Sequence, residues 1–77
     1  MTTTYRADDV PGLLRSGHII RRPPRKESLH AYAPDAHVRD ADGNLVGRVH
    51  ESTLRKLMRD DVVRVVRSEG VYEWVLR

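Results

Sequence analysis

Apolar positions in the second half of the chain repeat with a helical period. Leu54, Leu57 and Met58 are spaced by three and four residues, which places them on one face of a helix. Ser52 can cap the start of this helix, so the pattern predicts a helix over Ser52–Asp60. Its opposite, polar face carries three cations: Arg55, Lys56 and Arg59.

The C-terminal segment alternates apolar and polar residues, as a half-buried strand does. This pattern predicts a hairpin of Val62–Arg67 and Val71–Arg77, joined by a three-residue loop over Ser68, Glu69 and Gly70 with the glycine in the left-handed conformation. A second hairpin is predicted over Ala36–Val49, because Asp42-Gly43 between apolar runs is a strong turn signal.

The N-terminal part predicts shorter elements. A first helix begins at Asp8 or Asp9 and ends at Gly17, and a strand covers His18–Arg22. Residues 1–7 are expected to be frayed, residues 21–28 to form a Pro- and Arg-rich loop or arm, and Leu29–Ala33 to form a further strand. The core is expected to contain these apolar residues: Ile20, Leu54, Leu57, Met58, Val65 and Trp74.

A helix followed by a hairpin is the second half of a winged helix-turn-helix. The sequence therefore predicts one α+β, winged-helix-like domain over residues 1–77, with two short helices and β-hairpins. Motifs in the chain add a resemblance, carried by Leu13-Leu14-Arg15-Ser16-Gly17, His37–Gly43, Thr53-Leu54-Arg55-Lys56-Leu57 and Val71-Tyr72-Glu73-Trp74. Together they resemble the small winged-helix-like YjhX family of bacterial proteins. The resemblance implies the fold more than an activity, and it breaks at Ile20–Ala33, where this chain carries a Pro- and Arg-rich insertion.

Charge is plentiful and unevenly distributed. The chain has 14 Lys and Arg against 11 Asp and Glu, a net charge of +3. It has no cysteine, which excludes disulfides and thiolate zinc sites and favours a reducing, cytoplasmic compartment. No apolar run approaches the roughly 18 residues of a membrane span, so we expect no membrane partner.

Three groups of cations are candidates for binding nucleic acid. Arg55, Lys56 and Arg59 would face a groove, and Arg64 and Arg67 on the wing would hold flanking phosphates. The Pro-rich arm adds four more cations that could follow a nucleic-acid backbone: Arg21, Arg22, Arg25 and Lys26. A solvated helix face and a solubilising loop are the competing interpretations of the same residues. Glu51, Asp60 and Asp61 count against DNA, because acids at the helix ends repel phosphate.

Catalysis and metal binding find little support. Four histidines (His18, His30, His37 and His50) have no compact ligand spacing, and no cofactor is implied. Asp40–Asn44 resembles part of a calcium loop, but Leu45 stands where the sixth-position glycine is required, so a turn is the better interpretation. No serine lies in a Gly-x-Ser-x-Gly motif and no Gly-rich phosphate loop is present, so we expect no enzyme activity.

Two functions follow from the sequence. The first is a small basic nucleic-acid-binding protein, with DNA favoured over RNA, acting as a transcriptional regulator and with a homodimer left open. The second is a phage or mobile-element inhibitor of the anti-CRISPR kind, which binds an acidic protein surface without catalysis. The helix–hairpin order favours DNA, whereas the acids interspersed on the helix favour a protein partner.

Overall fold

The computed structural model describes residues 3–22 and 35–77 of the chain. Six strands and two short α-helices account for most of them, and a turn of 3-10 helix, Ala7–Asp9, precedes the first α-helix. The strands are β1 (Thr3–Thr4), β2 (Ile19–Arg22), β3 (Ala36–Arg39), β4 (Leu45–Val49), β5 (Val63–Ser68) and β6 (Val71–Leu76). The helices are α1 (Val10–Arg15) and α2 (Glu51–Arg59).

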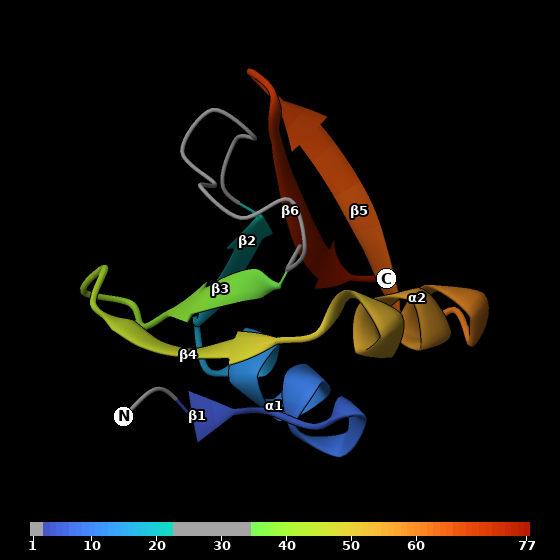
Figure 1. The fold of residues 1–77 in the computed structure, drawn as a ribbon, viewed down its shortest axis with the longest axis horizontal. Coiled ribbons are helices and arrows are strands. Elements are labelled where there is room, and N and C mark those ends of the chain that lie inside the picture. The colour runs from blue at the N-terminus through green and yellow to red at the C-terminus, as the bar shows by residue number, and fades with distance from the viewer. Residues whose placement is uncertain (1–2, 23–34) are drawn as a thin grey trace.

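All six strands belong to one mixed sheet in the order β1-β4-β3-β2-β6-β5 (Figure 1). Strand β2 holds the two hairpins together, because it pairs with β3 on one side and with β6 on the other, both antiparallel. Strand β1 adds a short parallel pair to β4.

The winged-helix prediction is wrong. A helix-turn-helix needs two helices joined by a short turn, whereas strands β2, β3 and β4 separate α1 from α2. The two hairpins were predicted correctly as local elements, but β2 joins them edge to edge into one sheet. The structure is therefore a sheet with two short helices packed against it, without the helix-rich core of a winged helix.

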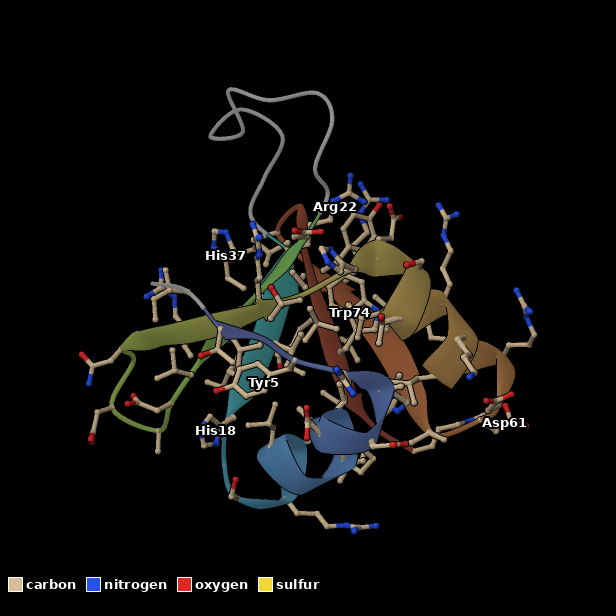
Figure 2. All side chains as sticks on the ribbon, turned by 60° about the horizontal axis from the view of Figure 1, so that its bottom comes forward. Tyr5, His18, Arg22, His37, Asp61 and Trp74 are labelled. Carbon is tan, nitrogen blue, oxygen red and sulfur yellow. The ribbon has the colours of Figure 1, made fainter. Side chains whose placement is uncertain are left out.

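The core lies between the helices and one face of the sheet. Val38, Ile20 and Trp74 are cross-strand neighbours, so their side chains share that face. Val10 of α1 and Leu54 and Leu57 of α2 belong to the same buried cluster. Figure 2 shows Trp74 near the centre of the molecule, beside α2. The rest of the buried cluster consists of Ala36, Val49 and Val63.

Four of the six predicted core residues are buried: Ile20, Leu54, Leu57 and Trp74. Met58 packs at the edge of the core and is partly buried. The prediction is wrong for Val65, which is 41% exposed. Its side chain lies on the core face of the sheet, because Val65 is opposite the buried Trp74, but β5 is the edge strand and leaves the side chain partly open to solvent.

The C-terminal end of α2 directs the chain into the last hairpin. Asp61 follows the helix with a left-handed φ of 60°, and the Val62 amide donates to the Leu57 carbonyl over 2.9 Å. The Asp61 carboxylate pairs with the Arg77 guanidinium. An acid is unfavourable near a helix C-terminus because of the helix dipole, and Asp61 is turned out of the helix and paired with a cation.

Two turns differ in detail from prediction. The last hairpin closes with a two-residue turn, because Glu69 and Gly70 both have positive φ, 52° and 80°. The β3–β4 connection is longer than the Asp42-Gly43 pair, since Asp40 accepts hydrogen bonds from the Asp42 and Asn44 amides at 3.0 and 2.9 Å. These bonds, chiefly the one from the Asn44 amide, hold the pKa of Asp40 below its ordinary value.

The N-terminal segment takes part in the sheet from Thr3 onward, although residues 1–7 were expected to be frayed. Thr3 and Thr4 pair with Gly47 and Arg48, and the Tyr5 amide donates to the Arg48 carbonyl over 2.9 Å. The Tyr5 ring lies over Gly47, where a glycine leaves the space that a side chain would fill. The predicted strand Leu29–Ala33 lies outside the described residues.

Candidate binding surface

The predicted cations of α2 are all exposed. Arg55, Lys56 and Arg59 lie on the side of the helix opposite Leu54 and Leu57. Arg55 is paired with Glu51, one turn earlier, over 3.1 Å between Nη2 and Oε1. Lys56 and Arg59 have no carboxylate within 4.0 Å among the residues that the structure describes.

The first two cations of the predicted arm lie in strand β2, so the loop interpretation is wrong for Arg21 and Arg22. Arg21 is bound to Glu73 of β6, with 2.7 Å between Nε and Oε1. Arg22, on the opposite face of the strand, approaches Glu51 at 3.7 Å. Both cations are thus partly neutralised. Arg25 and Lys26, the other two predicted arm residues, lie outside the described part of the chain.

The two predicted wing cations lie on β5 and point to opposite faces of the sheet. Arg64 is opposite Val75, and Arg67 is opposite Tyr72. The Arg67 guanidinium carbon lies 5.8 Å from the centre of the Tyr72 ring, within cation–π distance. Within residues 3–22 and 35–77, neither arginine has a carboxylate partner.

Strand β5 is also the last strand of the sheet. It pairs with β6 on one side, and no described strand pairs with its other side. Every residue from Arg64 to Ser68 is exposed. An uncovered edge of this length is uncommon, because its unpaired backbone groups invite association with another chain.

Exposed apolar side chains lie on β5 and on the neighbouring strand β6. Val65, Val66 and Tyr72 are exposed by 41, 38 and 36%, and they make up most of the exposed large apolar residues in the described chain. We define the β5 surface as these residues together with the two arginines: Arg64, Val65, Val66, Arg67 and Tyr72. Within the described part of the chain, it combines apolar area, two cations without a carboxylate partner and an unpaired backbone edge.

Sequence reasoning identified Arg64 and Arg67 but missed the rest of the β5 surface. The alternation around Val65 correctly predicts which face of the sheet it lies on. Alternation does not reveal whether another element covers that face, and Val65 was therefore assigned to the core.

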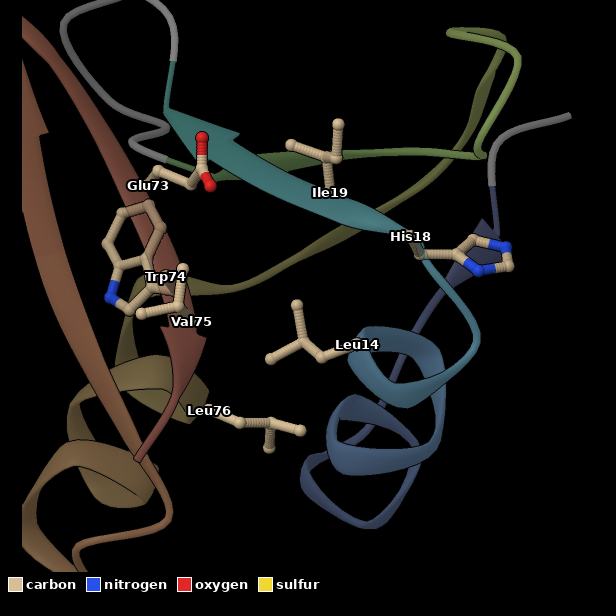
Figure 3. A pocket seen from close by; sticks show the side chains of 7 residues that line it. All are labelled: Leu14, His18, Ile19, Glu73, Trp74, Val75 and Leu76. Carbon is tan, nitrogen blue, oxygen red and sulfur yellow. The ribbon is translucent and has the colours of Figure 1, made fainter.

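A small cavity of about 170 Å³ opens where β2 and β6 diverge beside α1 (Figure 3). Leu14, Ile19, Val75 and Leu76 give it a largely apolar wall, with Glu73 and His18 also contributing. The Trp74 indole Nε1 is buried without a hydrogen-bond acceptor among the described residues, and it points away from Leu14. The two polar side chains of the lining have partners of their own, since Glu73 binds Arg21 and His18 lies beside Ser16.

Two of the three described histidines, His18 and His50, have side-chain partners. His18 Nδ1 lies 3.0 Å from Ser16 Oγ, and His50 Nδ1 lies 2.8 Å from Asp35 Oδ1. In residues 3–22 and 35–77, no three side chains of the His, Cys, Asp or Glu type gather as ligands of one metal ion would. None of the described helices combines the length and the apolar character needed to span a bilayer.

Comparison with protein-family models, with curated proteins and with solved structures gives no match to this chain. The resemblance to the YjhX family therefore stays a prediction that rests on its short motifs.

Proposed function

We propose that this protein is a non-catalytic protein-binding module and that the β5 surface is its interface. The observation that carries the proposal is the exposed edge strand β5, where Val65 and Val66 are exposed and Arg64 and Arg67 have no carboxylate partner among the described residues. Natural sheets usually protect such an edge by shortening, twisting or covering it, and extended segments of partner proteins add to edges that stay open.

The corrected fold changes the balance between the two functions that the sequence allows. DNA binding was favoured by the helix–wing order, and that order does not form a winged helix. Of the acids that counted against DNA, Glu51 lies close to both Arg22 and Arg55, so these two cations are partly neutralised and less available to phosphate. The cations without a carboxylate partner in the described chain also suit a protein partner with acidic groups. An inhibitor of the anti-CRISPR kind is one member of this class, and a cytoplasmic setting belongs to the same proposal.

Nucleic-acid binding through phosphate contacts is the second candidate. It is favoured by four exposed cations on the consecutive elements α2 and β5 that lack a carboxylate partner in the described chain: Lys56, Arg59, Arg64 and Arg67. Such binding would weaken steeply with salt, because each neutralised phosphate releases a counterion.

A photo-crosslinking experiment tests the proposed interface. The crosslinking amino acid p-benzoylphenylalanine is placed at Val66, and as a control at Arg15, an exposed position of α1. After irradiation in a lysate of the cells that produce the protein, we expect a discrete crosslinked species from position 66 and none from position 15. Excess wild-type protein should suppress this species, whereas excess Val65→Pro protein should not, because proline removes an amide from the edge of the strand.

Identical crosslinking from the two positions, or none from position 66, would refute the proposed interface. A parallel titration of labelled random duplex DNA at about 50 and about 200 mM salt tests the second candidate. Tight low-salt binding that Lys56→Ala and Arg59→Ala weaken would favour nucleic acid. A crosslinked species with twice the mass of the chain would identify a second copy as the occupant.

A further inference from the structure

The turn and register of the last hairpin fix which backbone groups of β5 are free. Ser68 and Val71 flank a two-residue turn, so they form a hydrogen-bonded pair, and bonded pairs then recur at every second residue. Arg64 and Val66 therefore bond to β6. The 3.2 Å hydrogen bond from the Arg77 amide to the Val62 carbonyl fits the same alternation, because Val62 is two residues before Arg64.

The backbone groups of Val65 and Arg67 consequently point away from β6, toward the free edge. Each of these residues offers one N–H and one C=O to an incoming strand. A partner strand of four or five residues would complete this set of hydrogen bonds, and its side chains would alternate between the two faces of the sheet as those of β5 do.

The side chains of β5 determine which residues an incoming strand should carry. Directly opposite pairs on one face interact, and opposite charges stabilise such pairs. Arg64 and Arg67 therefore favour acids opposite them, whereas Val65 and Val66 favour apolar residues. In antiparallel order this gives the pattern acid, apolar, apolar, acid.

A second copy of β5 fits this pattern poorly. Only Val65 and Arg67 present backbone groups at the free edge, so two copies would pair antiparallel with Val65 opposite either Val65 or Arg67. In these registers Arg64 lies opposite Val66 or Ser68, and Arg67 lies opposite Val63 or Val65, so no acid faces either arginine. The positive net charge of +3 on each copy also opposes self-association.

We infer that the free edge of β5 binds an extended segment of a partner protein with the pattern acid, apolar, apolar, acid, added as an antiparallel seventh strand. The inference rests on the proposed function and specifies the chemistry of the partner. Main-chain bonds to Val65 and Arg67 would provide affinity, and the acids opposite Arg64 and Arg67 would provide selectivity.

The test uses a fluorescein-labelled peptide, Ser-Thr-Glu-Val-Val-Glu-Thr-Ser, titrated with the full chain and followed by fluorescence anisotropy. A matched peptide, Ser-Thr-Lys-Val-Val-Lys-Thr-Ser, should bind about tenfold more weakly, since each exposed pair contributes only modestly. The double variant Arg64→Glu, Arg67→Glu should reverse this preference. Such a reversal depends on charge opposite the two positions and cannot arise from misfolding.

The variant Val65→Pro separates edge pairing from simple charge attraction. It leaves the charge unchanged, and proline is tolerated in an edge strand where its missing amide faces outward. We expect it to lose binding of the acidic peptide, whereas Val65→Thr should retain binding within about twofold, because threonine keeps the amide and the strand preference.

Equal binding of the two peptides, or acidic-peptide binding that survives Val65→Pro, would overturn the inference. The same holds if no peptide binds while position 66 still crosslinks to a partner, and in that case the proposed interface stands with a different partner chemistry. If no peptide binds and position 66 gives no crosslinked species, the proposed function itself is refuted. If sedimentation shows that the protein forms a dimer, and dimer formation prevents the peptide from binding, the occupant of the edge is a second copy and the inference is overturned.

Discussion

Replacing Gly47 with alanine should destabilise the fold, although the same change usually stabilises. An ideal Cβ at this position lies 2.3 Å from Tyr5 Cε2 and 2.6 Å from the Thr3 carbonyl oxygen. The first contact could be relieved by rotating the tyrosine ring, but the second is with backbone. Strand β1 must therefore move away from β4 to make room.

The magnitude follows from two opposing terms. Gly→Ala at a permitted conformation stabilises by about 0.4–1 kcal/mol, because the unfolded chain has less freedom to lose. Overpacking costs about 1–3 kcal/mol, and here it also strains the pairing of Thr3 and Thr4 with β4. We expect a net loss of about 1–2 kcal/mol, which lowers the melting temperature by roughly 4–16 °C for a domain of this size.

Urea unfolding measures this change, with the fluorescence of Trp74 as the probe because it is the single, buried tryptophan. Gly12→Ala is the matched control, since no atom lies within 4 Å of its added Cβ, and it should raise stability by about 0.5–1 kcal/mol. In a Tyr5→Ala background, Gly47→Ala should still destabilise because the Thr3 carbonyl remains. If Gly47→Ala is as stable as the wild type, β1 does not lie against β4 as described.

Further predictions concern the core, the last turn and the dependence of stability on pH in acid. Leu54→Ala should cost about 2–5 kcal/mol in urea unfolding because the side chain is fully buried, whereas Val65→Ala should change stability by less than about 0.5 kcal/mol. Gly70→Ala should cost about 1 kcal/mol, since φ is 80° there, and an unchanged urea midpoint would refute the two-residue turn. Asp40 has a pKa below its ordinary value near 3.8. Its contribution to the free energy of unfolding is therefore fully present above that value and is lost as the pH falls through the lower pKa of the folded state. Asp40→Asn should remove this part of the loss of stability in acid. If the urea midpoint falls equally steeply with pH in the wild type and in Asp40→Asn between about pH 6 and pH 2, Asp40 makes no such contribution.

The local elements were largely predictable because their signals are local. The helical spacing of Leu54 and Leu57 gave α2 within one residue at each end, and the alternation after Val62 gave the last hairpin. The way these elements combine was not predictable. Nothing in the pattern of Ile19–Arg22 shows that it pairs with strands on both sides, because that depends on contacts between segments far apart in the chain.

The candidate surface was predictable only in part, for the same reason. Arg64 and Arg67 were correctly assigned to an exposed hairpin. Arg21 was assigned to a free arm, yet its partner Glu73 lies 52 residues away, so its neutralisation could not be anticipated from the sequence. The open edge of β5 is likewise a property of the whole sheet and not of any one strand.

Hydrogen exchange of the backbone amides, followed by NMR on the isolated protein, tests most directly whether the edge of β5 is open. We expect alternation along the strand: the amides of Arg64 and Val66, bonded to β6, exchange slowly, and those of Val65 and Arg67 exchange fast. Binding of the acidic peptide should then slow the amides of Val65 and Arg67. Equal protection of all four amides in the isolated protein would show that the edge is already covered, which would contradict the proposed interface.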